Sequence, residues 1–257
     1  MSAGGLAAAQ TTSLRALNTE NEARAFVAVG RLDMGSNGFC TGTLIAPDLV
    51  LTAAHCVYNL QTGALTPPEQ IVFRAGLTEG RALAERKVMQ VVPHDRFNPL
   101  TGLNAENVIS DVALLRLETP IPVDQVPPFV VHAGPIDKGP VSIVSYGRGR
   151  SDSMSRQKQC EVLERYDRLI AMDCDVTFGS SGSPVFTHLN GRGRILSVVS
   201  GSGHHLGKKV SFGMELSVVV DQLKSRLRAD APRPKARVRR LGVSNERGDT
   251  GAKFVRP

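Results

Sequence analysis

Short apolar runs separated by Gly, Pro and Asn recur along most of the chain. They are rich in β-branched residues and too short for helices, which is typical of strands. No repeated alternation of strand and helix patterns accompanies them, so we do not expect a parallel sheet. We predict strands over residues 25–29, 42–45, 49–52, 71–75, 87–92, 112–117, 141–145, 160–166, 195–200 and 209–215.

One stretch near the C-terminus has helical spacing instead. Between residues 217 and 228, Val218, Val219, Leu223 and Leu227 fall near one face, which predicts an amphipathic helix. Residues 119–128 contain four prolines in ten positions, which favours an extended connection between two halves of the molecule.

The charge is concentrated at one end of a chain long enough for one large β domain or two packed barrels. Residues 226–257 hold ten Lys or Arg against three Asp or Glu, whereas residues 1–225 hold 21 of each, so the tail carries the net charge of +7. We predict that residues 229–257 form a basic disordered tail. The simpler interpretation is that this tail is a solvated extension. The more specific one is that the tail contacts anionic polymers.

The first residues resemble part of an export signal. Ala7-Ala8-Ala9 is similar to a signal-peptidase site, but neither a basic stretch nor a long apolar run precedes it. We interpret residues 1–22 as an N-terminal segment that retains the end of a signal peptide. Elsewhere no apolar run reaches the length of a membrane span, so we expect no membrane-spanning segment.

Three short motifs carry the chemistry. Ser181 lies in Thr177-Phe-Gly-Ser-Ser-Gly-Ser-Pro184, His55 in Leu51-Thr-Ala-Ala-His-Cys56, and Asp111 in Ser110-Asp-Val-Ala-Leu-Leu. Alone, each has a plain structural explanation: a flexible turn, a packed histidine and a turn-capping aspartate. Together they supply a nucleophile, a base that takes its proton, and a carboxylate that orients the base. The order of the motifs favours the chemical interpretation.

The motifs resemble those of trypsin- and chymotrypsin-like serine peptidases, in particular the secreted bacterial type. This resemblance covers residues 23–225 and implies an all-β fold of two packed antiparallel Greek-key barrels with a C-terminal helix. It implies barrels over 23–120 and 135–216, a linker over 121–134 and a helix over 217–228. An α/β-hydrolase elbow is excluded because Ser183 stands where that motif needs glycine.

The resemblance also assigns roles to single residues. It implies an endopeptidase with His55, Asp111 and Ser181 as the triad, and an oxyanion hole formed by the amides of Gly179 and Ser181. The four cysteines pair by position as Cys40 with Cys56 and Cys160 with Cys174. Each bridge closes a loop of about 15 residues and contributes roughly 3 kcal/mol. Two bridges indicate an oxidising compartment, so we expect a secreted or periplasmic protein; four reduced thiols in a cytosolic protein is the alternative.

Activation and specificity follow the family less closely. Ser180 replaces the aspartate that pairs with a newly cut N-terminus in many animal members, so we expect no activation by that ion pair. Asp175 lies six residues before Ser181, the offset of the carboxylate that binds Arg or Lys in trypsin-like enzymes. Val199 stands where glutamate-specific relatives place a histidine. The resemblance implies that Ser200, Gly201 and Ser202 line the substrate strand, with Ser200 also supporting Asp111.

We expect a monomer that acts on polypeptides without a cofactor. No metal site is expected at His55, because no second ligand lies at a suitable spacing beside the His-Cys pair. An esterase or a narrow processing peptidase would share these motifs. The alternative function is a catalytically silent or latent binding protein of the same fold.

Overall fold

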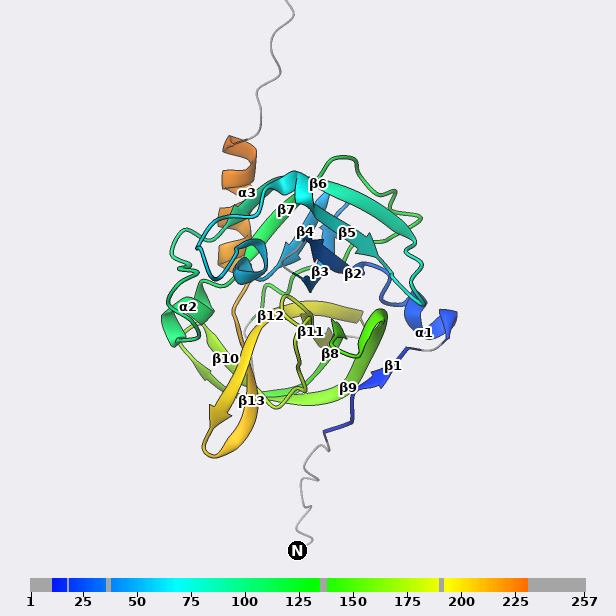
Figure 1. Ribbon diagram of the computed structural model, residues 1–257. Helices are drawn as coiled ribbons and strands as arrows, with labels where there is room; N and C mark the ends of the chain where they lie inside the picture. Colours follow the sequence, from blue (N-terminus) through cyan, green and yellow to red (C-terminus); the bar gives the residue numbers. More distant parts are fainter. Residues whose placement is uncertain (1–10, 18, 36–37, 135–137, 190–191, 231–257) are drawn as a thin grey trace, which may run out of the picture.

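The computed structural model describes residues 11–17, 19–35, 38–134, 138–189 and 192–230. Its strands form two antiparallel barrels that lie one above the other, and a helix lies beside the first (Figure 1). This architecture confirms the predicted fold class. The predicted basic tail and the alanine-rich start fall mainly on residues 231–257 and 1–10, outside the described residues.

The first barrel is closed by six strands in the order β2-β3-β4-β7-β6-β5. Alternating positions along them point inward, as in β5, where Ile71, Phe73 and Ala75 are fully buried. Its strands are β2 (Val29–Met34), β3 (Phe39–Ala46), β4 (Leu49–Thr52), β5 (Ile71–Ala75), β6 (Ala84–Pro93) and β7 (Ala113–Leu117).

The strand predicted over residues 25–29 is wrong. Residues 25–28 form a turn after α1 (Glu20–Arg24), and β2 begins only at Val29. Thr19 starts this helix: its hydroxyl accepts a hydrogen bond from the Glu22 amide and donates one to the Glu22 carboxylate. Two of the apolar residues that suggested a strand, Val27 and Ala28, are buried in the turn instead, whereas Ala25 is exposed.

The second barrel consists of β8 to β13, and the pairing of β8 with β9 completes the ring. The short strand β1 (Arg15–Ala16) pairs with β9, so part of the predicted N-terminal segment, residues 1–22, belongs to the fold. The apolar patterns in the sequence predicted neither β10 nor β11. β10 is short, and β11 follows directly on the serine motif. The strands are β8 (Gly139–Gly147), β9 (Arg150–Tyr166), β10 (Leu169–Met172), β11 (Pro184–Leu189), β12 (Arg192–His205) and β13 (Lys208–Met214).

The predicted C-terminal helix is α3 (Ser217–Ala229), which contacts β6 and β7 of the first barrel. Its buried face comprises Val219, Val220, Leu223 and Leu227, whereas Val218, assigned to that face from sequence, is 65% exposed. Three short helices complete the structure: η2 (Ala54–Val57), η3 (Pro68–Gln70) and α2 (Ala105–Ile109). Among the described residues, no helix has the length and apolar character needed to cross a membrane.

Candidate active site

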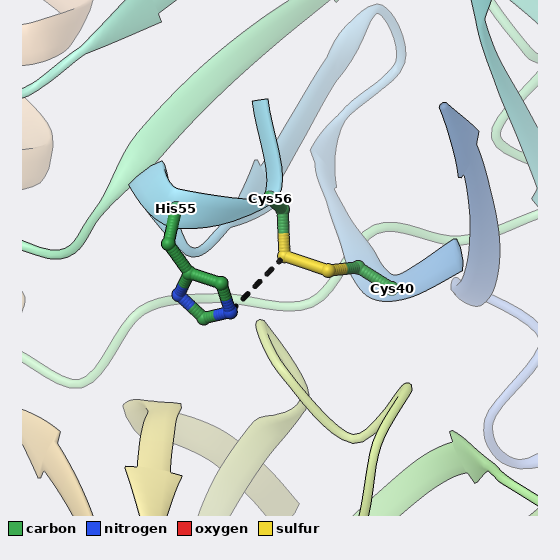
Figure 2. Close-up of side chains that lie close together, drawn as sticks. All are labelled: Cys40, His55 and Cys56. Atoms are coloured by element: carbon green, nitrogen blue, oxygen red, sulfur yellow. Dashed lines mark hydrogen bonds between the residues drawn. A yellow bond between two sulfur atoms is a disulfide. The ribbon is translucent and has the colours of Figure 1, made fainter. Parts of the chain in front are cut away.

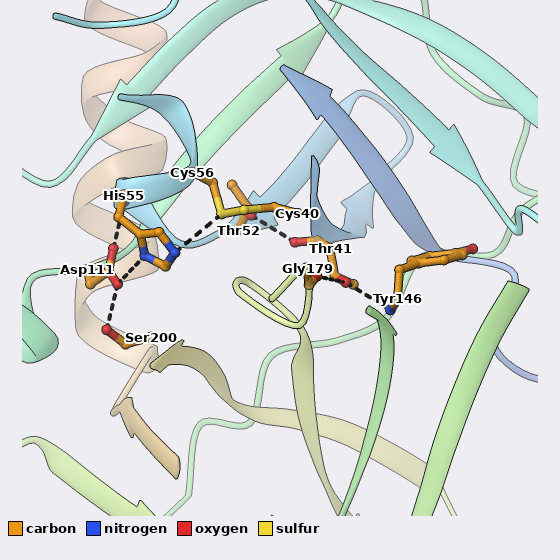
Figure 3. Close-up of a disulfide and its surroundings, with 9 residues drawn as sticks. All are labelled: Cys40, Thr41, Thr52, His55, Cys56, Asp111, Tyr146, Gly179 and Ser200. Atoms are coloured by element: carbon orange, nitrogen blue, oxygen red, sulfur yellow. Dashed lines mark hydrogen bonds and ion pairs between the residues drawn. A yellow bond between two sulfur atoms is a disulfide. The ribbon is translucent and has the colours of Figure 1, made fainter. Parts of the chain in front are cut away.

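His55 and Asp111 meet at the edge of the first barrel (Figure 3). His55 lies in η2 after β4, and Asp111 lies just before β7, which pairs with β4. One carboxylate oxygen, Oδ1, accepts the His55 amide at 2.7 Å, and Oδ2 lies 2.7 Å from Nδ1. Ser200 on β12 of the second barrel donates to the same Oδ2 at 2.5 Å. The carboxylate therefore fixes both the backbone and the ring of His55.

This pairing sets the protonation of His55. Burial lowers the pKa of the imidazole, but the charge of Asp111 and its hydrogen bond outweigh burial and raise the pKa above 6.5. A carboxylate only accepts, so Nδ1 carries the proton in this pair and Nε2 of the neutral ring keeps its lone pair. The arrangement is able to accept a proton at Nε2 and to stabilise the resulting imidazolium.

The predicted disulfide Cys40–Cys56 is present and lies against the imidazole (Figure 2). His55 Nε2 is 3.9 Å from Cys56 Sγ, and the sulfur and ring nitrogen atoms of Cys40, His55 and Cys56 lie within 4.8 Å of one another. Both sulfurs are oxidised, so neither is a thiolate that could bind a metal. The cluster holds the histidine loop to β3 and offers no metal ligand set in this state.

The turn that carries Ser181 needs glycine on both sides. Gly179 has φ +91° and Gly182 has φ +75°, a region that side chains disfavour. A Cβ at Gly179 would collide with the ring of Phe39, and one at Gly182 would collide with Thr52 and with the backbone of Thr41. The turn can therefore lie directly against the first barrel.

Thr41 on β3 joins this turn to the first barrel. Its amide donates to the Ser181 carbonyl at 2.9 Å, and its hydroxyl donates to the Gly179 carbonyl at 2.8 Å. The hydroxyl also accepts the Tyr146 amide of β8 at 3.0 Å (Figure 3). Thr41 follows Cys40, whose disulfide partner Cys56 follows His55. The serine turn and the histidine are therefore fixed to adjacent residues of β3, the turn to Thr41 and the histidine loop to Cys40.

Two backbone amides of the turn remain available. Within the described chain, neither Gly179 nor Ser181 uses its N–H in a hydrogen bond, whereas the Ser180 and Gly182 amides donate to Thr177 and Val199. The Ser181 hydroxyl likewise has no hydrogen-bond partner among the described residues, and its residue is partly exposed. A nucleophile and its base are often loosely paired before substrate binds.

Ser180, at the position of the missing aspartate, is fully buried. Its hydroxyl accepts from the Thr177 amide and from Arg150 Nη2, both at 3.3 Å, and lies 3.3 Å from the Tyr146 carbonyl. A cation from β9 thus stands beside this turn. Sequence reasoning missed both Thr41 and Arg150, because their roles depend on contacts with residues far away in the chain.

A pocket of about 260 Å³ opens beside His55. Its far side includes Ser200, Gly201 and Ser202, the three residues predicted to line a substrate strand. Leu103 packs directly against this strand, because a Cβ at Gly201 would be 3.0 Å from its Cδ1. The apolar part of the lining comprises Leu60, Phe97, Pro99, Leu103 and Val108.

Asp175 is exposed, and its amide, not its carboxylate, makes the contact that holds it, a 2.7 Å bond to Gln157 Oε1. A carboxylate in solvent selects cationic side chains weakly. The predicted disulfide Cys160–Cys174 is present and joins β9 to this segment. The basic-specificity residue expected from sequence is therefore placed near the turn without being enclosed.

Comparison with known proteins agrees with this geometry. The profile of the trypsin-like peptidase domain matches residues 40–194. Serine protease SP24D of Anopheles gambiae is 37% identical over 131 residues, which are 48% of this chain and 44% of that protein. Collagenase of Hypoderma lineatum is 26% identical over 197 residues, which are 68% of this chain and 71% of that protein.

A likeness of fold extends to a solved structure. The structure titled "Structure of Glu endopeptidase in complex with MPD" superimposes with a TM-score of 0.67 and 19% identity, covering 84% of this chain and 97% of that one. The match to the mosquito protein spans less than half of that relative. The peptidase-domain profile covers more than half of this chain and includes the histidine, aspartate and serine motifs, so the chain is a member of the trypsin-like peptidase domain family.

Proposed function

We propose that this protein is a serine endopeptidase with His55, Asp111 and Ser181 as its catalytic triad. The observation that carries the proposal is the chain of bonds from Ser200 through Asp111 to His55 Nδ1. It leaves the lone pair of Nε2 unused by Asp111, with only a 3.9 Å contact to Cys56 Sγ. Such a chain is what a base needs to accept a hydroxyl proton and hold the resulting charge. The anchoring of the Ser181 carbonyl on Thr41, next to the disulfide that holds His55, also supports it.

The reaction would proceed in two steps, acylation of Ser181 and hydrolysis of the acyl-enzyme. Ser181 Oγ attacks the peptide carbonyl while its proton moves to His55 Nε2, and the oxyanion is held by the free amides of Gly179 and Ser181. The C–N bond then breaks, and the leaving amine takes the proton from His55. Water, deprotonated by the same nitrogen, hydrolyses the acyl ester and returns the proton to Ser181.

The pocket beside His55 and the strand along it suggest how a substrate binds. A polypeptide would lie along Ser200–Ser202, with an apolar side chain in the pocket beside His55. A preference for Arg or Lys at the cleaved residue rests on the offset of Asp175 alone, and its exposure leads us to expect a modest effect. A panel of Arg-, Lys-, Glu- and Phe-ended peptides, read against Asp175→Asn, measures it.

We also propose that this is a secreted member of the bacterial type. The grounds are Ser180 in place of the aspartate, the cation Arg150 beside it, and two disulfides that require an oxidising compartment. The site would then form without insertion of a new N-terminus. Comparing chains trimmed to different starts tests this, and activity confined to one free terminus would contradict it.

Labelling with a fluorophosphonate probe tests the triad. We expect the disulfide-intact protein to be labelled and Ser181→Ala not to be labelled. Ser183→Ala is the matched control, because Ser183 lies two residues away, is fully buried, and its hydroxyl has no hydrogen-bond partner. Folded protein that resists labelling would overturn the proposal and favour a latent or silent binding protein.

A further inference from the structure

The segment that leads into the serine turn has no regular structure of its own. Residues 173–177 form neither helix nor strand between β10 and the turn. They are held by a few specific contacts: the Cys160–Cys174 bridge, the Asp173 carboxylate that accepts the Glu161 amide at 2.6 Å, and the Asp175 amide bound to Gln157. The position of this segment therefore depends on what fixes those partners.

Gln157 is the partner with contacts on two sides. It lies on β9 and is fully buried. Its Oε1 accepts the Asp175 amide at 2.7 Å, and its Nε2 donates to the Thr12 carbonyl at 2.8 Å. One amide side chain thus joins the N-terminal segment to the residues before Ser181. Loss of either contact leaves a buried amide group without a partner.

The N-terminal segment is built onto β9 by further bonds. The Thr12 amide donates to the Gln159 carbonyl at 2.8 Å, and Thr12 Oγ1 accepts the Gln159 amide at 2.9 Å. Arg15 and Ala16 form β1, which pairs with β9 (Figure 1), and Leu17 is buried in the core. Thr11 Oγ1 donates to the other oxygen of Asp173 at 2.7 Å. Residues 11–17 therefore contact Asp173 directly and reach Asp175 through Gln157.

We propose that Gln157 is a positioning residue that makes the geometry of the Ser181 turn depend on residues 11–13. The proposal rests on the proposed hydrolase function of Ser181. It differs from activation by a free terminus, because the contact made to Gln157 is a mid-chain carbonyl and not an ammonium. Detaching residues 11–13 would release Gln157 and loosen Asp175, six residues before the nucleophile.

The test uses five proteins besides the full-length chain, one of them the shortened chain that also carries Gln157→Met. Gln157→Met removes both contacts, and Gln157→Glu keeps an acceptor for Asp175 while losing the donor to Thr12. A third chain begins after Ser13, which spares the pairing of β1 and the buried Leu17. Gln159→Met is the matched control, since the contacts of Gln159 with Thr12 run through its backbone and the Thr12 hydroxyl.

We expect Gln157→Met and the shortened chain each to lower kcat and the labelling rate at Ser181 about 10-fold. Gln157→Glu should fall between them and the full-length chain, and Gln159→Met should match the full-length chain. Shortening Gln157→Met further should have little extra effect, because the path through Gln157 is already broken and, of the bonds to residues 173–175, only the exposed Thr11–Asp173 bond is lost in addition. Additive losses, or full activity of the shortened chain at temperatures where it is folded, would overturn the proposal.

Hydrogen exchange at the Asp175 amide separates this proposal from the peptidase proposal. We expect faster exchange in the shortened chain than in the full-length chain, whether or not the protein is labelled. Unchanged exchange would overturn the role of Gln157 even if Ser181 is a nucleophile. Faster exchange in a protein that no probe labels would instead leave the contact standing and overturn the triad.

Discussion

The guanidinium of Arg150 reaches the hydroxyl of Ser180, with Nη2 3.3 Å from Oγ, in the residue just before Ser181. The same group donates to the carbonyl and the hydroxyl of Ser145 at 2.8 and 3.1 Å. Ser145 and Ser180 are fully buried, so these contacts lie inside the second barrel. Burial lowers the pKa of Arg150, but a guanidinium stays charged in a protein. The turn is therefore supported by a cation from within the folded chain.

Replacing Arg150 should weaken this support. In Arg150→Met the apolar stem stays while the donors to Ser145 and Ser180 are lost, and we expect kcat to fall about 10-fold with a smaller change in KM. Arg150→Lys keeps the charge but not the planar fork, so an intermediate value is expected. Steady-state kinetics below the melting temperature measure both parameters.

Arg165→Met is the matched control for this experiment. Arg165 lies at the far end of the same strand, β9, and pairs with Glu215 at a partly exposed site. We expect its kcat to equal that of the unchanged protein. A wild-type kcat in folded Arg150→Met would show that the turn keeps its geometry without the cation.

The pH dependence should follow His55. The base acts when neutral, and its pKa is raised above 6.5, so the labelling rate should rise with pH through a midpoint above 6.5. In Asp111→Asn the charge that raises the pKa is gone while burial, which lowers it, remains. We expect that midpoint to move down and the plateau to fall about 10⁴-fold, the size seen when such a carboxylate is replaced in a related triad. Labelling rates across pH for both proteins check this.

The same shift has a consequence for stability. A raised pKa in the folded state means that folding favours the protonated ring, so this contribution is present below pH 6.5 and is lost as pH rises through the folded value. Denaturant unfolding across that range should show the loss in the unchanged protein and not in Asp111→Asn. Parallel curves for the two proteins would contradict the pairing.

Thr41 offers a test of how the barrels are joined. Thr41→Val removes the hydroxyl that binds the Gly179 carbonyl and the Tyr146 amide, so we expect a loss of about 1–3 kcal/mol in unfolding free energy and a lower kcat. Thr43→Val is the control: Thr43 lies on the same strand, is fully buried, and its hydroxyl has no partner. We expect that change to be neutral or stabilising. Equal effects of the two would rule out a special role for Thr41.

Much of the fold could be predicted because its strands are local patterns. β4 and β5 have the predicted bounds. β5 alternates between buried and half-buried positions, and β4 is a short and mostly buried run, so each forms a local pattern. Residues 25–28 escaped prediction because a capped helix precedes them, and apolar residues in a turn look like a strand when read alone.

The site residues also fall into two groups, those that belong to a local motif and those that do not. His55, Asp111 and the Ser181 turn could be proposed as site residues from sequence because their motifs are local and follow a known order. Thr41, Arg150 and Gln157 could not, because each acts through contacts with residues more than a hundred positions away or on a neighbouring strand. Asp175 shows the converse: its offset from Ser181 suggested an enclosed carboxylate, but the bridge at Cys174 and the bond to Gln157 hold it in an exposed segment.

The pocket beside His55 should select the residue that a substrate places there. Leu103 is 52% exposed and closes one wall against Gly201, so Leu103→Ala widens the pocket. We expect kcat/KM for peptides with a large apolar side chain beside the cleaved residue to fall about 10-fold, while peptides with Ala at that position change little. Leu100→Ala is the control, because Leu100 is on the same loop, is 64% exposed and does not line the pocket. An equal loss for both peptides in Leu103→Ala would point to a disturbed histidine instead of an altered pocket, because His55 serves every substrate whereas the wall contacts only a bulky one.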